Sequence, residues 1–157
     1  MKIDKIKTLN EMEKTFNNFI DYVNSDIEQI SIENFNAKET VLVIIDMVNG
    51  FVREGALSSP YVDKIASGIF DLAKNPLELL DFNAKNILVT GCVTDICIRD
   101  FSKTMKKYLE ENDIDANIYL IENLIDTFDI DGVHNRELEH ILALYDMKNS
   151  GINIVQS

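Results

Sequence analysis

Several residue types that define special classes of protein are scarce in this chain. Its 157 residues include no tryptophan, two prolines, six glycines and two cysteines. Two cysteines are too few for the disulfide scaffold of small secreted domains, so a cytoplasmic protein is expected. The low proline and glycine content excludes collagen-like and low-complexity chains. No signal peptide is expected at the start, and no apolar run approaches the roughly 18 residues that span a bilayer.

Positive charge is also scarce, since 15 basic residues stand against 27 acidic ones and the formal net charge is −12. Such a field repels nucleic-acid phosphates and anionic membrane surfaces, so neither is an expected partner. What the chain does have is apolar content, at 46% hydrophobic residues. That is enough for one domain spanning residues 1–157 with a single core.

The first 38 residues are predicted to form an N-terminal helical extension of this domain. Between Thr8 and Val23 the apolar residues recur at intervals of three and four, which predicts one apolar helix face. Residues 27–35 are expected to attach this helix to the core. The face consists of Leu9, Met12, Phe16, Phe19, Ile20 and Val23.

From residue 41 onwards, apolar β-branched runs alternate with helical patterns. The run Val41-Leu-Val-Ile-Ile-Asp46 predicts a strand buried on both faces, and further strands are expected at 86–91, 117–121 and 152–155. Helices are predicted after Pro60, at 77–82, from 94 to 111 and from 134 to 147. This alternation predicts an α/β fold with a mainly parallel sheet of about four strands.

Ligands bind beyond the carboxyl ends of strands in such sheets, and two polar features fall there. Asp46 ends the first strand, and residues 91–97 connect the second strand to its helix. If Thr94 or Asp95 caps that helix, Cys97 lies in its first turn, where the helix dipole lowers a thiol pKa. Asp46 could then act as general base. The alternative is a buried structural cysteine, which is also the interpretation for Cys92.

A metal site receives little support from the sequence. Cys92 and Cys97 form a Cys-x4-Cys pair, but His134 and His140 are the only histidines and are six residues apart. A structural zinc ion needs about four ligands, so none is expected. The acidic loop containing Asp126, Asp129 and Asp131 lacks the calcium-loop pattern, and a solvent-exposed loop is expected there.

Two motifs resemble those of a known family. Val41-Leu-Val-Ile-Ile-Asp-Met-Val-Asn-Gly-Phe51 resembles the first motif of the isochorismatase-like cysteine hydrolases, which include nicotinamidases. Val89-Thr-Gly-Cys-Val-Thr-Asp-Ile-Cys97 resembles their nucleophile motif. The stretch from Asp126 to Arg136 is similar to one branch of the family, so the resemblance extends from about residue 39 to the C-terminus.

The resemblance implies a Rossmann-like three-layer sandwich and a Cys-Asp-Lys triad. Cys97 would be the nucleophile and Asp46 the general base. A cis peptide bond would join Cys92 to Val93, and the backbone N–H groups of Val93 and Cys97 would form the oxyanion hole. The substrate pocket would include the residues Asn49, Phe51 and Thr94.

The triad lysine is harder to place, because family members carry it on strands between the two motifs. Here only about 50 residues separate Asp46 from Cys97, which is little more than one helical crossover. We therefore infer that an internal segment of the family pattern is missing. Lys64 is the candidate for the triad lysine. The alternative, which we favour, places Lys64 in the ordinary helix after the first motif. Lys74 is a weaker candidate for the triad lysine. Zinc or another divalent metal would need ligands from the missing segment.

Without those strands, the first strand would become an apolar sheet edge, which a second copy of the chain could cover. We therefore expect a homo-oligomer that hydrolyses a small amide through a cysteine thioester. One alternative is isochorismatase-type vinyl-ether hydrolysis, although a nucleophilic cysteine suits acyl chemistry better. The other is a catalytically impaired family remnant that acts as a binding or oligomerisation domain.

Overall fold

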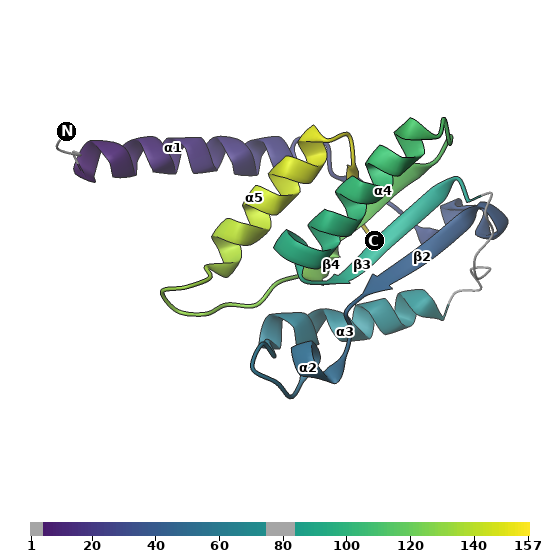
Figure 1. Ribbon diagram of the computed structural model, residues 1–157, viewed down its shortest axis with the longest axis horizontal. Coiled ribbons are helices and arrows are strands. Elements are labelled where there is room, and N and C mark those ends of the chain that lie inside the picture. Colours follow the sequence, from purple (N-terminus) through teal and green to yellow (C-terminus); the bar gives the residue numbers. More distant parts are fainter. Residues whose placement is uncertain (1–4, 75–83) are drawn as a thin grey trace.

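The computed structural model describes residues 5–74 and 84–157 of the chain. The short helix expected at 77–82 lies outside these residues. Within them the chain forms a mixed α/β fold around one sheet, as the alternating sequence pattern predicts (Figure 1).

The sheet has five strands, and all their pairings are parallel. Their spatial order is β1-β5-β4-β3-β2, so β2 lies at one edge and β1 at the other. Four of them match the expected strands, whereas β1 is only two residues long and gave no apolar run to detect. The strands are β1 (Glu28–Gln29), β2 (Thr40–Ile45), β3 (Asn86–Cys92), β4 (Asn117–Asp126) and β5 (Asn153–Gln156).

Helices cover both faces of the sheet and complete a three-layer sandwich (Figure 1). One face carries α4, α5 and the C-terminal end of α1, and the other carries α3. A π-helical turn, η3, leads directly into α4. The bounds are α1 (Lys5–Asn24), α2 (Asn49–Val52), α3 (Pro60–Ala73), η3 (Thr94–Ile98), α4 (Arg99–Glu111) and α5 (Arg136–Asn149), with 3-10 turns η1 (Ile32–Asn34) and η2 (Ala37–Glu39).

The core follows from the strict alternation of side chains along the central strands. Val89 and Leu120 point to the face covered by α4 and α5, while Leu88 and Ile121 point to the face covered by α3. All four side chains are fully buried. Burial of each stabilises the fold by about 2 kcal/mol relative to exposure.

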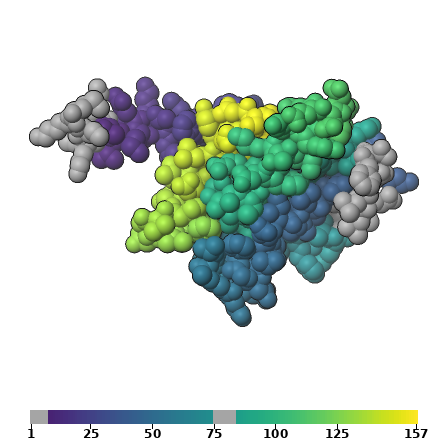
Figure 2. Space-filling model, in the orientation of Figure 1, coloured from purple at the N-terminus to yellow at the C-terminus, as the bar shows by residue number. Residues whose placement is uncertain are grey.

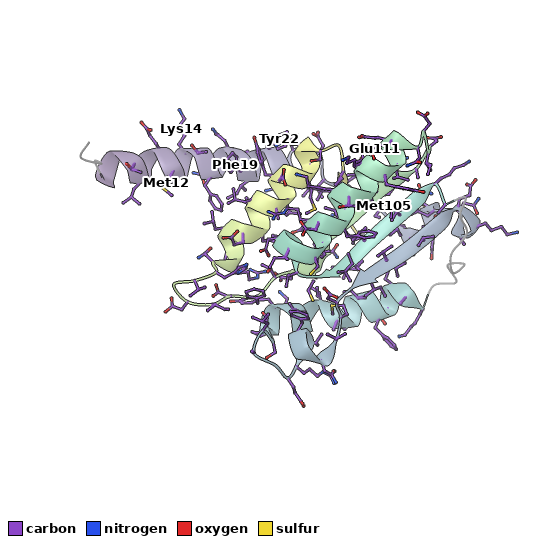
Figure 3. All side chains as sticks on the ribbon, viewed as in Figure 1. Met12, Lys14, Phe19, Tyr22, Met105 and Glu111 are labelled. Carbon is purple, nitrogen blue, oxygen red and sulfur yellow. The ribbon has the colours of Figure 1, made fainter. Side chains whose placement is uncertain are left out.

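The two halves of α1 have different surroundings. Its C-terminal end packs on α5, where the ring centroids of Phe19 and Tyr145 are 4.2 Å apart and Lys148 Nζ donates to the Tyr22 carbonyl at 2.6 Å. Its N-terminal half projects from the body (Figure 2). There Met12 is 60% exposed on the side facing α5, and Lys14 lies on the opposite side (Figure 3).

None of the helices in the described ranges is long and apolar enough to cross a membrane. At the sheet edge, β2 leaves Ile44 42% exposed. The expectation that this strand forms an edge is confirmed.

Candidate active site at the carboxyl ends of two strands

Asp46 follows β2 directly and has an unusual backbone. Its φ is +52°, in the left-handed region that few residues other than glycine, asparagine and aspartate adopt. Its carbonyl accepts hydrogen bonds from the Val48 N–H at 2.8 Å and from the Cys92 thiol at 3.2 Å. The side chain is exposed at the end of the sheet. The turn therefore presents the carboxylate outward, beside the end of β3.

Gly91 allows the two strands to approach at this point. Its φ is +114°, and a Cβ there would lie 2.1 Å from the Ile45 carbonyl oxygen. Every other residue type would both clash with β2 and occupy a strained conformation. The glycine of the second motif is thus required by the geometry that brings Asp46 beside the end of β3.

The chain turns sharply after Gly91. The Cys92–Val93 peptide bond is cis, as the family resemblance implies. The Val93 carbonyl then accepts from the N–H groups of Ile96 and Ile98, both at 3.2 Å, so the turn has π-helical spacing. The cap predicted at Thr94 or Asp95 is wrong, because Val93 occupies the N-cap position and both polar side chains bind other partners.

Cys97 lies on this turn beside Asp46. Its half-buried thiol lies close enough to the Asp46 carboxylate and the Val93 backbone N–H for both to influence its pKa. The hydrogen bond to Asp46 is the main reason that the pKa of Cys97 is raised, with burial and the Asp46 charge adding to it. The predicted lowering of this pKa is therefore wrong. The nearby negative charge outweighs the Val93 N–H, which acts in the opposite direction.

Cys92 also has a raised pKa but, unlike Cys97, it is fully enclosed. Its side chain is fully buried, and its thiol donates to the Asp46 carbonyl. Burial, followed by the charges of Asp46 and Cys97, raises its pKa to about 12. Such a thiol stays protonated and is inaccessible to reagents.

The expected pocket residues occupy three different settings. Phe51 on α2 packs against the apolar cluster of Val62, Cys92, Val93 and Phe128, which Cys97 also contacts. Asn49 begins α2 and is exposed. Thr94 is fully buried, and its hydroxyl lies 3.0 Å from Nδ1 of His140. Phe51 is thus the one of the three that shares an apolar cluster with Cys97.

No hydrogen bond or ion pair joins Lys64 or Lys74 to Asp46 or Cys97 in the described part of the chain. Lys64 is exposed on α3, and Lys74 pairs with Asp71 at 2.8 Å. The charged groups among the main influences on the Cys97 thiol are the carboxylates of Asp46 and Asp100. The site as described holds a thiol and a base without an adjacent ammonium group.

Behind the turn lies a buried polar network that the sequence reasoning missed. Asp95 accepts from the Thr127 hydroxyl at 2.6 Å and lies 3.0 Å from Nε2 of His134, whose Nδ1 is 3.0 Å from the Phe128 carbonyl. Burial alone would raise the pKa of Asp95, but the hydrogen bonds from Thr127 and His134 prevail and lower it. The sequence signal was weak, because Asp95 and His134 are 39 residues apart.

The start of the acidic loop is also buried, contrary to the expectation of a solvent-exposed loop. Asp126, the last residue of β4, receives two hydrogen bonds from the Arg136 guanidinium, at 2.8 and 2.7 Å. The guanidinium also stacks over the Tyr61 ring at 4.2 Å. Asp129 and Asp131 further along are exposed, as expected. The expectation is therefore wrong for Asp126, which belongs to β4 and is buried with it.

Across residues 5–74 and 84–157, no group of three histidine, cysteine or acidic side chains is arranged to hold a metal ion. The two histidines bind Asp95 and Thr94 rather than converging on one point.

Comparisons with known proteins give no relative. No family model, no curated protein and no solved structure matches the chain.

Proposed function

We propose that the protein is a cysteine hydrolase of the isochorismatase-like type that cleaves a small amide. The observation that carries this proposal is that the adjoining ends of β2 and β3 bring Asp46 beside Cys97, where its carboxylate is the main cause of the raised pKa of the thiol. A thiol hydrogen-bonded to a carboxylate is the resting state of a nucleophile with its general base.

The reaction follows from these two groups. Asp46 removes the thiol proton as the Cys97 sulfur attacks the carbonyl carbon of the amide, and the carbonyl oxygen becomes an oxyanion. Collapse of this intermediate breaks the C–N bond, and Asp46 returns the proton to the leaving ammonia or amine. A water molecule deprotonated by Asp46 then attacks the thioester, which releases the acid and restores the thiol.

Two backbone features support acyl chemistry at this turn. The Val93 N–H interacts with the Cys97 sulfur, and Cys97 lies within η3, which begins at Thr94 directly after Val93. N–H groups at a helix start stabilise a developing oxyanion without reorganisation. The expected oxyanion hole of Val93 and Cys97 N–H groups therefore remains part of the proposal.

One observation favours the second candidate, a catalytically impaired remnant that binds a ligand or oligomerises. The pKa of Cys97 is raised, chiefly by the hydrogen bond to Asp46. A cation beside the sulfur would lower it, and no lysine is among its main influences in the part of the chain that the structure describes. In this second case the Asp46–Cys97 pair would persist without measurable turnover.

Thiol reactivity and turnover together test the proposal. Peptide mass spectrometry after timed iodoacetamide treatment should show Cys97 alkylated much faster than the buried Cys92. The folded protein should release ammonia from members of a panel of small carboxamides that includes nicotinamide, and Cys97→Ala should abolish this release. Equal, slow labelling of both cysteines, or ammonia release that persists in a folded Cys97→Ala variant, would exclude the nucleophile assignment.

A further inference from the structure

Both histidines of the chain bind neighbouring residues on the turn that carries Cys97. His134, in the loop before α5, contacts Asp95, and His140, on α5, contacts Thr94. Thr94 and Asp95 are both buried behind the turn. The turn is thus attached to α5 and its preceding loop by two side chains that lie outside the two strand-end motifs.

The geometry of His134 excludes a role as a catalytic base. Both ring nitrogens face acceptors, because Nδ1 lies 3.0 Å from the Phe128 carbonyl and Nε2 lies 3.0 Å from an Asp95 carboxylate oxygen. A neutral imidazole has one N–H and satisfies one acceptor, whereas the doubly protonated ring satisfies both. In either state both ring nitrogens are occupied by these contacts, so neither is open to a substrate proton.

Asp95 is likewise fully engaged. One carboxylate oxygen accepts from the Thr127 hydroxyl at 2.6 Å and the other faces His134. Its side chain is 7% exposed, so it cannot contact a substrate that reaches Cys97 from solvent. The contacts fix the first turn of η3 against the end of β4, where Thr127 follows the last strand residue.

We propose that Asp95 and His134 are positioning residues, which hold the turn from Val93 to Cys97 so that its backbone N–H groups point at the developing oxyanion. This inference rests on the proposed function, since it assumes that Cys97 forms an acyl intermediate. His140 supports the same turn through Thr94, and its Nε2 lies 3.9 Å from a carboxylate oxygen of Glu122 on β4.

Two reactions of the same sulfur separate positioning from a merely structural role. Acylation by p-nitrophenyl acetate passes through an oxyanion and benefits from aligned N–H groups. Alkylation by iodoacetamide displaces iodide and forms no oxyanion. Loss of alignment should therefore slow acylation without an equal effect on alkylation. Nitrophenolate release measures the first rate, and peptide mass spectrometry assigns the acetyl and carbamidomethyl groups to Cys97.

A matched pair at Thr127 gives the sharpest comparison. Thr127→Val removes the hydroxyl that binds Asp95 at nearly constant volume, whereas Thr127→Ser keeps it. We expect Thr127→Val and His134→Gln to slow acylation about tenfold or more and to change alkylation by less than about twofold. Thr127→Ser should retain most of the acylation rate. If Thr127→Val or His134→Gln shows the same ratio of acylation rate to alkylation rate as the wild type, the inference is wrong.

A destabilised variant without a contact to these side chains serves as control. Val23 is buried on α1, which packs near the C-terminal end of α5 through Tyr145 and Lys148. Val23→Ala should lower the resistance to urea and leave the ratio unchanged, and an equal change in Val23→Ala would overturn the inference. Absence of acylation on Cys97 in the wild-type protein would instead refute the proposed function, and the positioning role with it.

Discussion

The two sides of Cys97 differ in how their polar groups are held. Toward β4 and α5, Asp95 and Asp126 are buried and each is bound by a partner that carries N–H donors. Toward β2, Asp46 and Asn49 are exposed at the end of an edge strand. The polar groups toward β4 and α5 are held in place by buried contacts, whereas those toward β2 are exposed to solvent.

This difference predicts how substitutions on each side of the site affect stability. Removing one partner of a buried charge pair lowers the stability of the protein, whereas exposed charged groups contribute little to it. Substitutions toward β4 should therefore lower stability in addition to any effect on the alignment of the turn, whereas substitutions toward β2 should change the chemistry and leave stability nearly unchanged. The following predictions test this division, from the largest expected effect to the smallest.

Gly91→Ala should destroy the contact between the two sides. The added Cβ would lie 2.1 Å from the Ile45 carbonyl oxygen, at a φ of +114°. We expect the free energy of unfolding to fall by about 3 kcal/mol or more, measured by urea denaturation. Gly132→Ala is the control, because Gly132 also has a positive φ, +69°, but open space around it. Equal losses in both variants would show that crowding at Gly91 is unimportant.

Arg136→Met should be the next most damaging change. It leaves the Asp126 carboxylate, 7% exposed, with only the Thr127 N–H as a donor among the contacts described. We expect a loss of about 2–3 kcal/mol, less than for a fully buried pair because Arg136 is 25% exposed. The double variant Asp126→Asn/Arg136→Met should recover part of this loss. A double variant no more stable than Arg136→Met would contradict this account.

Asp46→Asn should leave stability nearly unchanged and alter the thiol. The side chain is exposed and asparagine tolerates a positive φ, so the unfolding free energy should move by less than about 0.5 kcal/mol. The pKa of Cys97 should fall, because its largest cause of elevation is removed. The pH dependence of Cys97 alkylation measures it, while acylation by p-nitrophenyl acetate should slow through loss of the base. A pKa that stays the same or rises would refute the Asp46–Cys97 contact.

The smallest effect concerns the pH dependence of stability. Burial alone would lower the pKa of His134, but the hydrogen bond and charge of Asp95 prevail and raise it, with Glu139 adding to the effect. The stabilisation is complete below the ordinary histidine pKa of about 6.5 and is lost as pH rises through the raised value. Asp95 acts at lower pH, because its pKa is lowered and its contribution is lost only on acidification.

The stability difference between the wild type and His134→Gln should therefore shrink as pH rises above about 6.5. Urea denaturation across this range measures it. A difference that is constant or grows with pH would show that His134 binds Asp95 in its neutral form.

Much of the fold could be predicted from the sequence because its strands are long apolar runs. Ile87 to Val89 on β3 are buried by helices on both faces, so the apolar content of that run indicates their position. Val41 to Ile45 on the edge strand β2 are only partly buried and Ile44 is 42% exposed, so the prediction that this strand is buried on both faces is wrong. The strand β1 could not be found this way, since two residues carry no periodicity. Its existence depends on pairing with β5, a contact distant in the sequence.

The site was predictable where one strand end determines it and not where distant segments meet. Asp46 and Cys97 follow apolar strands, so their placement at one edge of the sheet could be expected. The partners of Thr94 and Asp95 lie on α5 and the loop before it, and no local pattern assigns them. The pKa of Cys97 was mispredicted for the same reason, because the effect of a neighbouring carboxylate depends on distance rather than on spacing in the chain.

The pairing of β1 with β5 has a consequence for how the chain is made. Gln29 of β1 bonds to Gln156 of β5 across 127 positions, so the segment that leaves the ribosome early has no partner strand until almost all the described chain has emerged. Until then the apolar face of α1 lacks Tyr145 and Lys148 of α5 to pack against. The N-terminal extension can therefore dock only after α5 and β5 are in place, which makes it a late step of folding.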